Sequence, residues 1–177
     1  MAQFSRCFIT IDKKHFLNPA TFGLVFVLQF FAGHAISTQK LFSAYIITTI
    51  LFLVLGLITS FYARQLRISL SFILGYLLMG LLRLVLFNVP LVSILGIMIT
   101  PTFYLFSFHM LSDPVTAPKN NNDKIYAGAI VALIDGIFRM AEIPYGQFYA
   151  SLITGCIFAL YLSNPKMKIV ANENIQI

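Results

Sequence analysis

The chain has 177 residues, of which 59% are hydrophobic and only 10% are charged, and its mean hydropathy is +0.86. A soluble domain is usually about half apolar and about a quarter charged. This composition therefore excludes a soluble domain and indicates that most of the chain is surrounded by lipid. A helical crossing takes about 20 residues, which leaves room for about six spans and no separate soluble catalytic domain. The net charge of +6 comes from Lys and Arg scattered between apolar runs. That pattern is typical of a topology signal and not of a nucleic-acid surface.

Six apolar stretches are predicted to cross the membrane as helices. They span residues 19–37, 41–63, 68–87, 91–111, 125–139 and 143–163. Asn18 is expected to cap the first helix, with Pro19 at its first position. A turn is predicted at residues 88–90, and Pro101 should kink the fourth helix. The sequence therefore predicts an all-α fold, a polytopic transmembrane helical bundle of about six spans.

The distribution of Lys and Arg predicts the orientation of these spans. Nine of the 12 fall on the side of the N-terminus, namely Arg6, Lys13, Lys14, Arg64, Arg67, Lys119, Lys124, Lys166 and Lys168. The other three are Lys40, Arg83 and Arg139. Because positive charge is retained in the cytoplasm, we expect a multi-pass protein of the inner (cytoplasmic) membrane with both termini in the cytoplasm. The predicted units are a cytoplasmic segment at 1–18, a transmembrane domain at 19–164 and a cytoplasmic tail at 165–177.

Asp135 and Arg139 are ionisable residues inside the predicted fifth span. Their spacing of four places both on one face of a helix, within reach of each other. They could form an ion or proton relay or a ligand clamp, or they could neutralise each other as a structural pair, which is the favoured interpretation. Arg83 in the third span could join them by reaching Asp135 or Glu142 across the bundle, or it could extend to the headgroups.

Metal binding and nucleophilic catalysis have no signature in the chain. His15, His34 and His109 lie in three separate places, so no metal site is predicted. The sequence also contains no P-loop, dinucleotide fingerprint or Ser-His-Asp order. Whether the chain is an enzyme stays open on these grounds.

The stretch Ser112-Asp113-Pro114-Val115-Thr116-Ala117-Pro118 follows the fourth span and is predicted to be a re-entrant or capping loop. Its two prolines stiffen the backbone. The Asp113 and Thr116 side chains can bind backbone amides or the polar edge of a ligand.

Several stretches resemble the RnfD, NqrB and RsxD family of membrane electron-transport subunits. FSFHMLSDPVTAP at residues 106–118 is similar to the D-P-V-T-[AS] loop of that family, and HFLNPA at 15–20 is similar to the start of one of its helices. RISLSF at 67–72 resembles the start of the preceding span, and Tyr126-Ala-Gly-Ala, Arg139 and Pro144-x-Gly146-x-x-Tyr149-Ala150 resemble the two closing spans. The resemblance covers roughly residues 64–162 in the order of the family, together with the short stretch near Asn18.

The chain also departs from the family. Members have more spans, arranged as a pair of repeats, and many attach FMN covalently through a Thr in an outer [SG]-x-A-T loop. The predicted outer loops here lack that pattern. The resemblance therefore implies FMN or riboflavin, or a quinone, held noncovalently by Asp113, Thr116 and Asn18, or no cofactor. Asp135 stands near a position that is apolar in the family.

Three functions are compatible with these observations. The first is a membrane electron-transport subunit, at most one subunit of a redox complex. The second is a transporter or channel-like half that completes its fold by oligomerising, and the third is a non-catalytic structural membrane partner. The expected partners are the lipid bilayer and either other membrane subunits or a second copy of the chain, and not nucleic acid.

Overall fold

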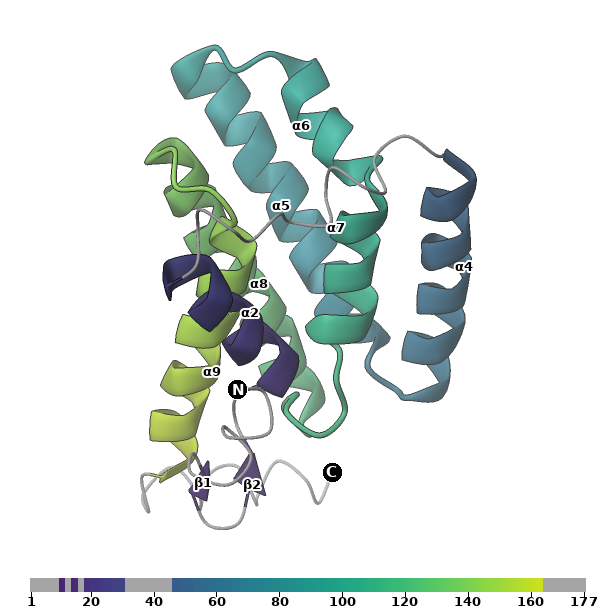
Figure 1. The fold of residues 1–177 in the computed structure, drawn as a ribbon, viewed down its shortest axis with the longest axis vertical. Helices are drawn as coiled ribbons and strands as arrows, with labels where there is room; N and C mark the ends of the chain where they lie inside the picture. The colour runs from purple at the N-terminus through teal and green to yellow at the C-terminus, as the bar shows by residue number, and fades with distance from the viewer. Residues whose placement is uncertain (1–9, 12–13, 16–17, 31–45, 164–177) are drawn as a thin grey trace.

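The computed structural model describes residues 10–11, 14–15, 18–30 and 46–163. Apart from one short antiparallel ladder, they form helices and the connections between them (Figure 1). The ladder joins β1 (Thr10–Ile11) to β2 (Lys14–His15). The helices are α2 (Pro19–Phe30), α4 (Ile46–Tyr62), α5 (Leu66–Phe87), α6 (Leu91–Met98), α7 (Pro101–Leu105), the π-helical η1 (Phe106–Met110), α8 (Asn121–Met140) and α9 (Gly146–Ser163).

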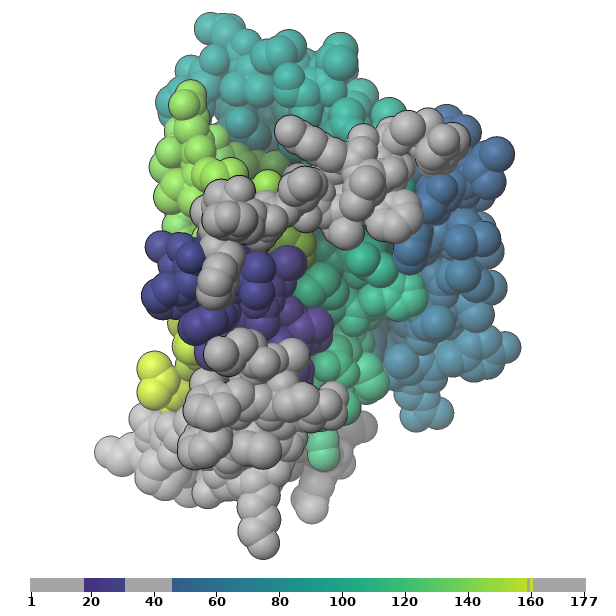
Figure 2. Space-filling view, in the orientation of Figure 1, coloured from purple at the N-terminus to yellow at the C-terminus, as the bar shows by residue number. Residues whose placement is uncertain are grey.

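The predicted helical fold is confirmed for this part of the chain. Residues 31–45, which hold the end of the predicted first span and the start of the second, lie outside the described residues, as does the predicted tail at 165–177. The helices pack as one bundle in which α8 lies between α5 and α9, α2 contacts α9, and α4 contacts α7 and η1 (Figure 1). Figure 2 shows α4 as the blue block at the right edge of the molecule, beside the green surface of α7 and η1.

Aromatic rings fill the centre of the bundle. The Phe72 ring centroid lies 5.2 Å from that of Phe106 and 5.7 Å from that of Phe103. Phe106 in turn meets Phe148 of α9 edge to face at 5.4 Å. These contacts join α5, α7, η1 and α9 around one apolar core, at the centroid separations that favour aromatic pairs.

Small residues line the contact between α5 and α8. Gly128, Ala132 and Gly136 recur every four residues and therefore share one face of α8. A Cβ added at Gly75 of α5 would come within 2.6 Å of the Ala132 Cβ, and one added at Gly128 would collide with the Ile68 carbonyl oxygen. Only small residues permit backbones to approach so closely, as is common between helices in membranes.

The predicted fourth span is broken at the expected place. Its two halves, α6 and the pair α7 and η1, bend by 59° at residues 99–100, just before Pro101. The Thr49 hydroxyl donates to the Ile99 carbonyl at 2.8 Å and so satisfies a carbonyl at the break. At the other end the Leu111 N–H donates to the Phe106 carbonyl at 2.9 Å, which closes the wide turn of η1.

The start of the fifth predicted helix is corrected by the structure. Helix α8 begins at Asn121 and not at Ile125, because the Asn120 side chain accepts the Asn122 N–H at 3.4 Å and caps the helix. The polar residues before Ile125 are thus its first turn, and the helix has 20 residues. Similarly, Arg67 lies within the first turn of α5 rather than before the helix.

Helix α5 is the one described helix that is by itself long and apolar enough to cross a membrane. The bent pair of α6 with α7 and η1 adds a second crossing if the pair is counted as one span. Within the described residues α2, α4 and the stretch Gly146–Phe158 are apolar but shorter.

Candidate functional site

Asn18 connects the start of α2 to the end of η1. Its Oδ1 accepts the Ala20 N–H at 2.9 Å, so the predicted N-cap is confirmed. Its Nδ2 donates to the Met110 carbonyl at 2.8 Å and to Asp113 Oδ2 at 3.4 Å. One amide therefore caps a helix and holds a loop that is more than 90 residues further along the chain.

Asp113 organises the loop at residues 112–118. Its Oδ1 accepts the Val115 N–H at 3.1 Å, and its Oδ2 lies 3.5 Å from the Thr116 hydroxyl, which donates to it. The Asp113 carbonyl also accepts the Ala117 N–H at 2.8 Å. The three predicted site residues, Asn18, Asp113 and Thr116, are thus brought together. Their polar atoms bind one another and make a tight turn of the capping kind.

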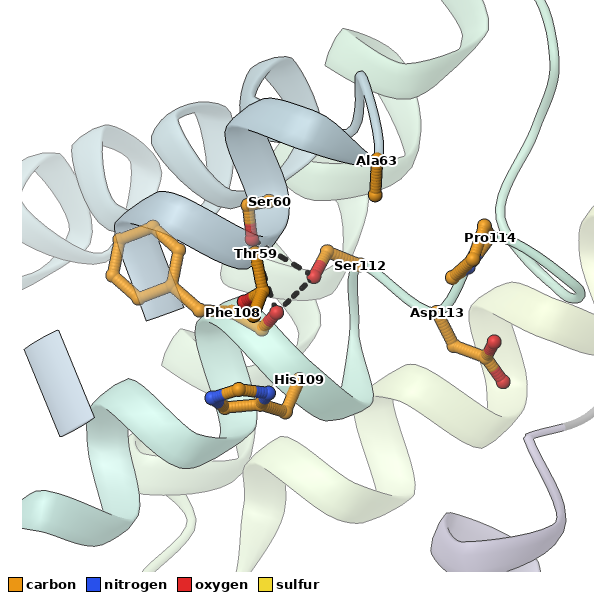
Figure 3. A pocket seen from close by; sticks show the side chains of 8 residues that line it. All are labelled: Thr59, Ser60, Ala63, Phe108, His109, Ser112, Asp113 and Pro114. Carbon is orange, nitrogen blue, oxygen red and sulfur yellow. Dashed lines mark hydrogen bonds between the residues drawn. The ribbon is translucent and has the colours of Figure 1, made fainter. Parts of the chain in front are cut away.

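A small hollow lies beside this loop, where the end of α4 faces η1 (Figure 3). Its volume is about 140 Å³. The Ser60 hydroxyl donates to the Phe108 carbonyl at 3.0 Å and lies 3.2 Å from the Ser112 hydroxyl. Figure 3 shows the two serines directed toward each other and the Asp113 carboxylate directed away from them. The hollow is lined by Thr59, Ser60, Ala63, Phe108, His109, Ser112, Asp113 and Pro114.

These residues do not fit an enclosed flavin. Pockets for ligands of drug size measure about 300–1,000 Å³, well above the 140 Å³ of this hollow. The oxygens of Asp113 are also engaged by Asn18, Val115 and Thr116.

A second polar cluster joins α5, α8 and α9. Arg139 Nε donates to Asp135 Oδ2 at 2.7 Å, so the predicted pair on one helix face is confirmed. Arg139 Nη2 donates to Gln147 Oε1 at 2.9 Å, and its guanidinium carbon lies 5.2 Å from the centre of the Tyr76 ring. Asp135 is fully buried. We call Tyr76, Asp135, Arg139 and Gln147 the polar cluster.

The second oxygen of Asp135 faces the start of α9. A Cβ added at Gly146, the first residue of α9, would lie 3.1 Å from Asp135 Oδ1. The N-terminus of a helix is its positive end, so a carboxylate is stabilised there. Asp135 Oδ1 and Gln147 Nε2 have no hydrogen-bond partner among the described residues. The geometry favours the structural interpretation, in which the pair ties the end of α8 to α9.

Arg83 makes no ion pair with Asp135 or Glu142 among the described residues. Its charge still acts on Asp135 at longer range, so both alternatives for Arg83 stay predictions. Arg83 lies seven residues beyond Tyr76 on α5, about 10 Å along the helix axis, whereas Arg139 reaches Asp135 from its own helix. Sequence reasoning missed Tyr76 and Gln147. Gln147 was visible as a polar residue inside an otherwise apolar stretch.

No protein-family model, curated protein or solved structure matches this chain. In the part of the chain that the structure describes, no group of three or more His, Cys, Asp or Glu residues is placed to hold a metal ion. Functional proposals therefore depend on the residues of the chain itself.

Proposed function

We propose that the chain crosses the inner membrane about six times, with both termini in the cytoplasm. Its composition, the long apolar helix α5 and the bent pair that follows support this placement. Large apolar side chains remain exposed along α4 and α5, as expected where lipid covers them. The nine-to-three distribution of Lys and Arg supports the orientation.

Within the membrane the chain acts as a subunit of an electron-transport complex of the RnfD, NqrB and RsxD kind. One observation carries this proposal. Two of the stretches that resemble the family, 15–20 and 106–118, lie far apart in sequence, and they meet where Asn18 Nδ2 contacts Asp113 Oδ2 at 3.4 Å. That meeting supports a shared scaffold, because the residues of the resemblance form one local structure rather than unrelated matches.

The hollow beside Asp113 is smaller than the pockets that enclose ligands of drug size. In this proposal any flavin site is completed by another membrane subunit, and the chain supplies the rigid loop at residues 112–118. Its role is then that of a scaffold and docking subunit in a redox complex.

Visible absorption spectra of two preparations test the proposal. The chain purified alone in mild detergent should be colourless, and the assembly isolated from its native membrane should show a flavin band that acid precipitation releases. A colourless assembly would contradict the electron-transport role. Flavin fluorescence that stays with the denatured chain would contradict noncovalent binding, and Thr21, Thr38 and Thr116 would then be examined as attachment sites.

A transporter-like half is the second candidate, and two features favour it. The fourth span is broken and bent by 59°, and Asp135 is buried with one oxygen unpaired among the described residues. Broken helices and buried charges mark ion and substrate paths in many transporters. Ion flux into vesicles that contain only this chain, lost in Asp135→Asn, would favour this role over electron transport.

A further inference from the structure

The start of α8 lies beside the turn from α4 to α5 (Figure 1). Three cationic residues belong to these two segments. Lys124, in the first turn of α8, donates from Nζ to the Arg64 carbonyl at 2.9 Å. Arg67 lies in the first turn of α5, and its charge acts on the Lys124 ammonium. We call Arg64, Arg67 and Lys124 the cationic cluster.

The cationic cluster lacks a carboxylate partner in the described part of the chain. Its three members make no ion pair there. The neighbouring acid, Asp123, makes none either. A group of like charges held together in this way repels itself, and an anion would offset the repulsion.

Lys124 is buried to an unusual degree for a lysine, with 5% of its surface exposed. Burial lowers its pKa, and the Arg67 guanidinium lowers it further. A lysine ammonium carries three donors, and among the described residues this one has a single acceptor, the Arg64 carbonyl. Keeping a charged group buried without an opposite charge is costly, so an anion bound here would recover stability.

The start of α5 adds to the positive potential. Its N-terminus has no side-chain cap and no acidic residue in its first turn. The helix dipole therefore places further positive charge beside Arg67. Arg64 and Arg67 are exposed, so an anion can reach the cluster from outside the bundle.

We propose that the cationic cluster binds a phosphate-bearing anion, with the headgroup of an anionic phospholipid as its main source. Phosphate oxygens accept from a lysine ammonium and from arginine forks together. The cluster lies on the predicted cytoplasmic side, where anionic lipids create a negative surface and basic pockets between helices bind their headgroups. The inference uses the proposed membrane placement but not the electron-transport role.

Native mass spectrometry tests the proposal on the full chain in mild detergent with equal amounts of phosphatidylglycerol and phosphatidylcholine. The wild type should retain phosphatidylglycerol preferentially. Arg67→Gln and Lys124→Gln should each reduce that preference about fivefold, which corresponds to about 1 kcal/mol per cation. Arg83→Gln is the matched control, because it removes a cation 16 residues away on the same helix, about 24 Å from Arg67. Its lipid preference should equal that of the wild type.

Inorganic phosphate in a second arm distinguishes a lipid from a soluble phosphate compound. In one outcome neither lipid is preferred, while phosphate raises the melting temperature of the wild type and not of Arg67→Gln. That result would support the anion site and identify a soluble phosphate compound, not a lipid, as its ligand. Arg67 is exposed, so this variant should fold even if Lys124→Gln does not. The proposal is overturned if no lipid is preferred and phosphate has no effect, or if Arg83→Gln loses as much preference as Arg67→Gln. Each of these results is independent of whether the assembly carries a flavin.

Discussion

Arg139 is the residue through which α5, α8 and α9 are joined by polar contacts. It donates to Asp135 and Gln147 and lies over the Tyr76 ring, and 17% of its side chain is exposed. The spacing to Asp135 was readable from the sequence because one helix period determines it. The contacts with Tyr76 and Gln147 could not be predicted from the sequence, because they depend on how three helices pack.

Replacing Asp135 by Asn should leave the half-buried Arg139 guanidinium without its counter-charge. We expect the free energy of unfolding to fall by about 1–3 kcal/mol. Combining Asp135→Asn with Arg139→Gln should recover much of that loss, because no unpaired charge remains. Thermal unfolding in detergent measures both variants. A double variant that folds normally but has lost activity would show that the pair serves function and not only stability.

Asn18 makes a second prediction at the residue scale. Asn18→Ala removes the cap of α2 and the bond to the Met110 carbonyl, so stability should fall by about 1–2 kcal/mol. The loop at 112–118 should also be cut faster by protease. Asn122→Ala is the matched control, since Asn122 is exposed and contributes only its backbone N–H to the cap. Equal effects of the two substitutions would contradict the role given to Asn18.

The helices show what hydrophobic periodicity, helix caps and prolines could and could not predict. Its start was placed too late because the run Asn120 to Lys124 is polar, and polarity masked the N-cap signal of Asn120. The break at Pro101 was predicted, since proline cannot donate to the preceding turn. The contact of α8 with α5 was missed, although the recurrence of Gly128, Ala132 and Gly136 every four residues was a usable signal.

Two glycine substitutions are expected to change the stability of the protein in opposite directions, and the first of them tests the contact between α5 and α8. Gly128→Ala should destabilise the protein by about 1–3 kcal/mol, because its Cβ would collide with the backbone of α5. Gly96→Ala in α6 should instead stabilise it by about 0.5–1 kcal/mol, because nothing lies within 4 Å of the added Cβ and alanine favours the helix. Melting temperatures of both variants provide the measurement. A melting temperature of Gly128→Ala equal to or above that of the wild type would mean that α5 and α8 do not pack as described.

For the molecule as a whole, composition predicted the helical class, but the sequence did not predict how the helices meet. Asn18 and the loop at 112–118 were singled out separately, and only the fold places them in contact. The volume of the hollow beside them follows from the packing of α4 on η1, so the poor fit of a flavin was not visible in the motif.

The scaffold role and the lipid site both require the loop at 112–118 and the cationic cluster to face the cytoplasm. Reporters fused after Ile177 and inserted at Lys40 measure this directly in intact cells. The asymmetry of Lys and Arg predicts a cytoplasmic signal after Ile177 and an external signal at Lys40. Both reporters on the same side of the membrane would contradict the six-span arrangement.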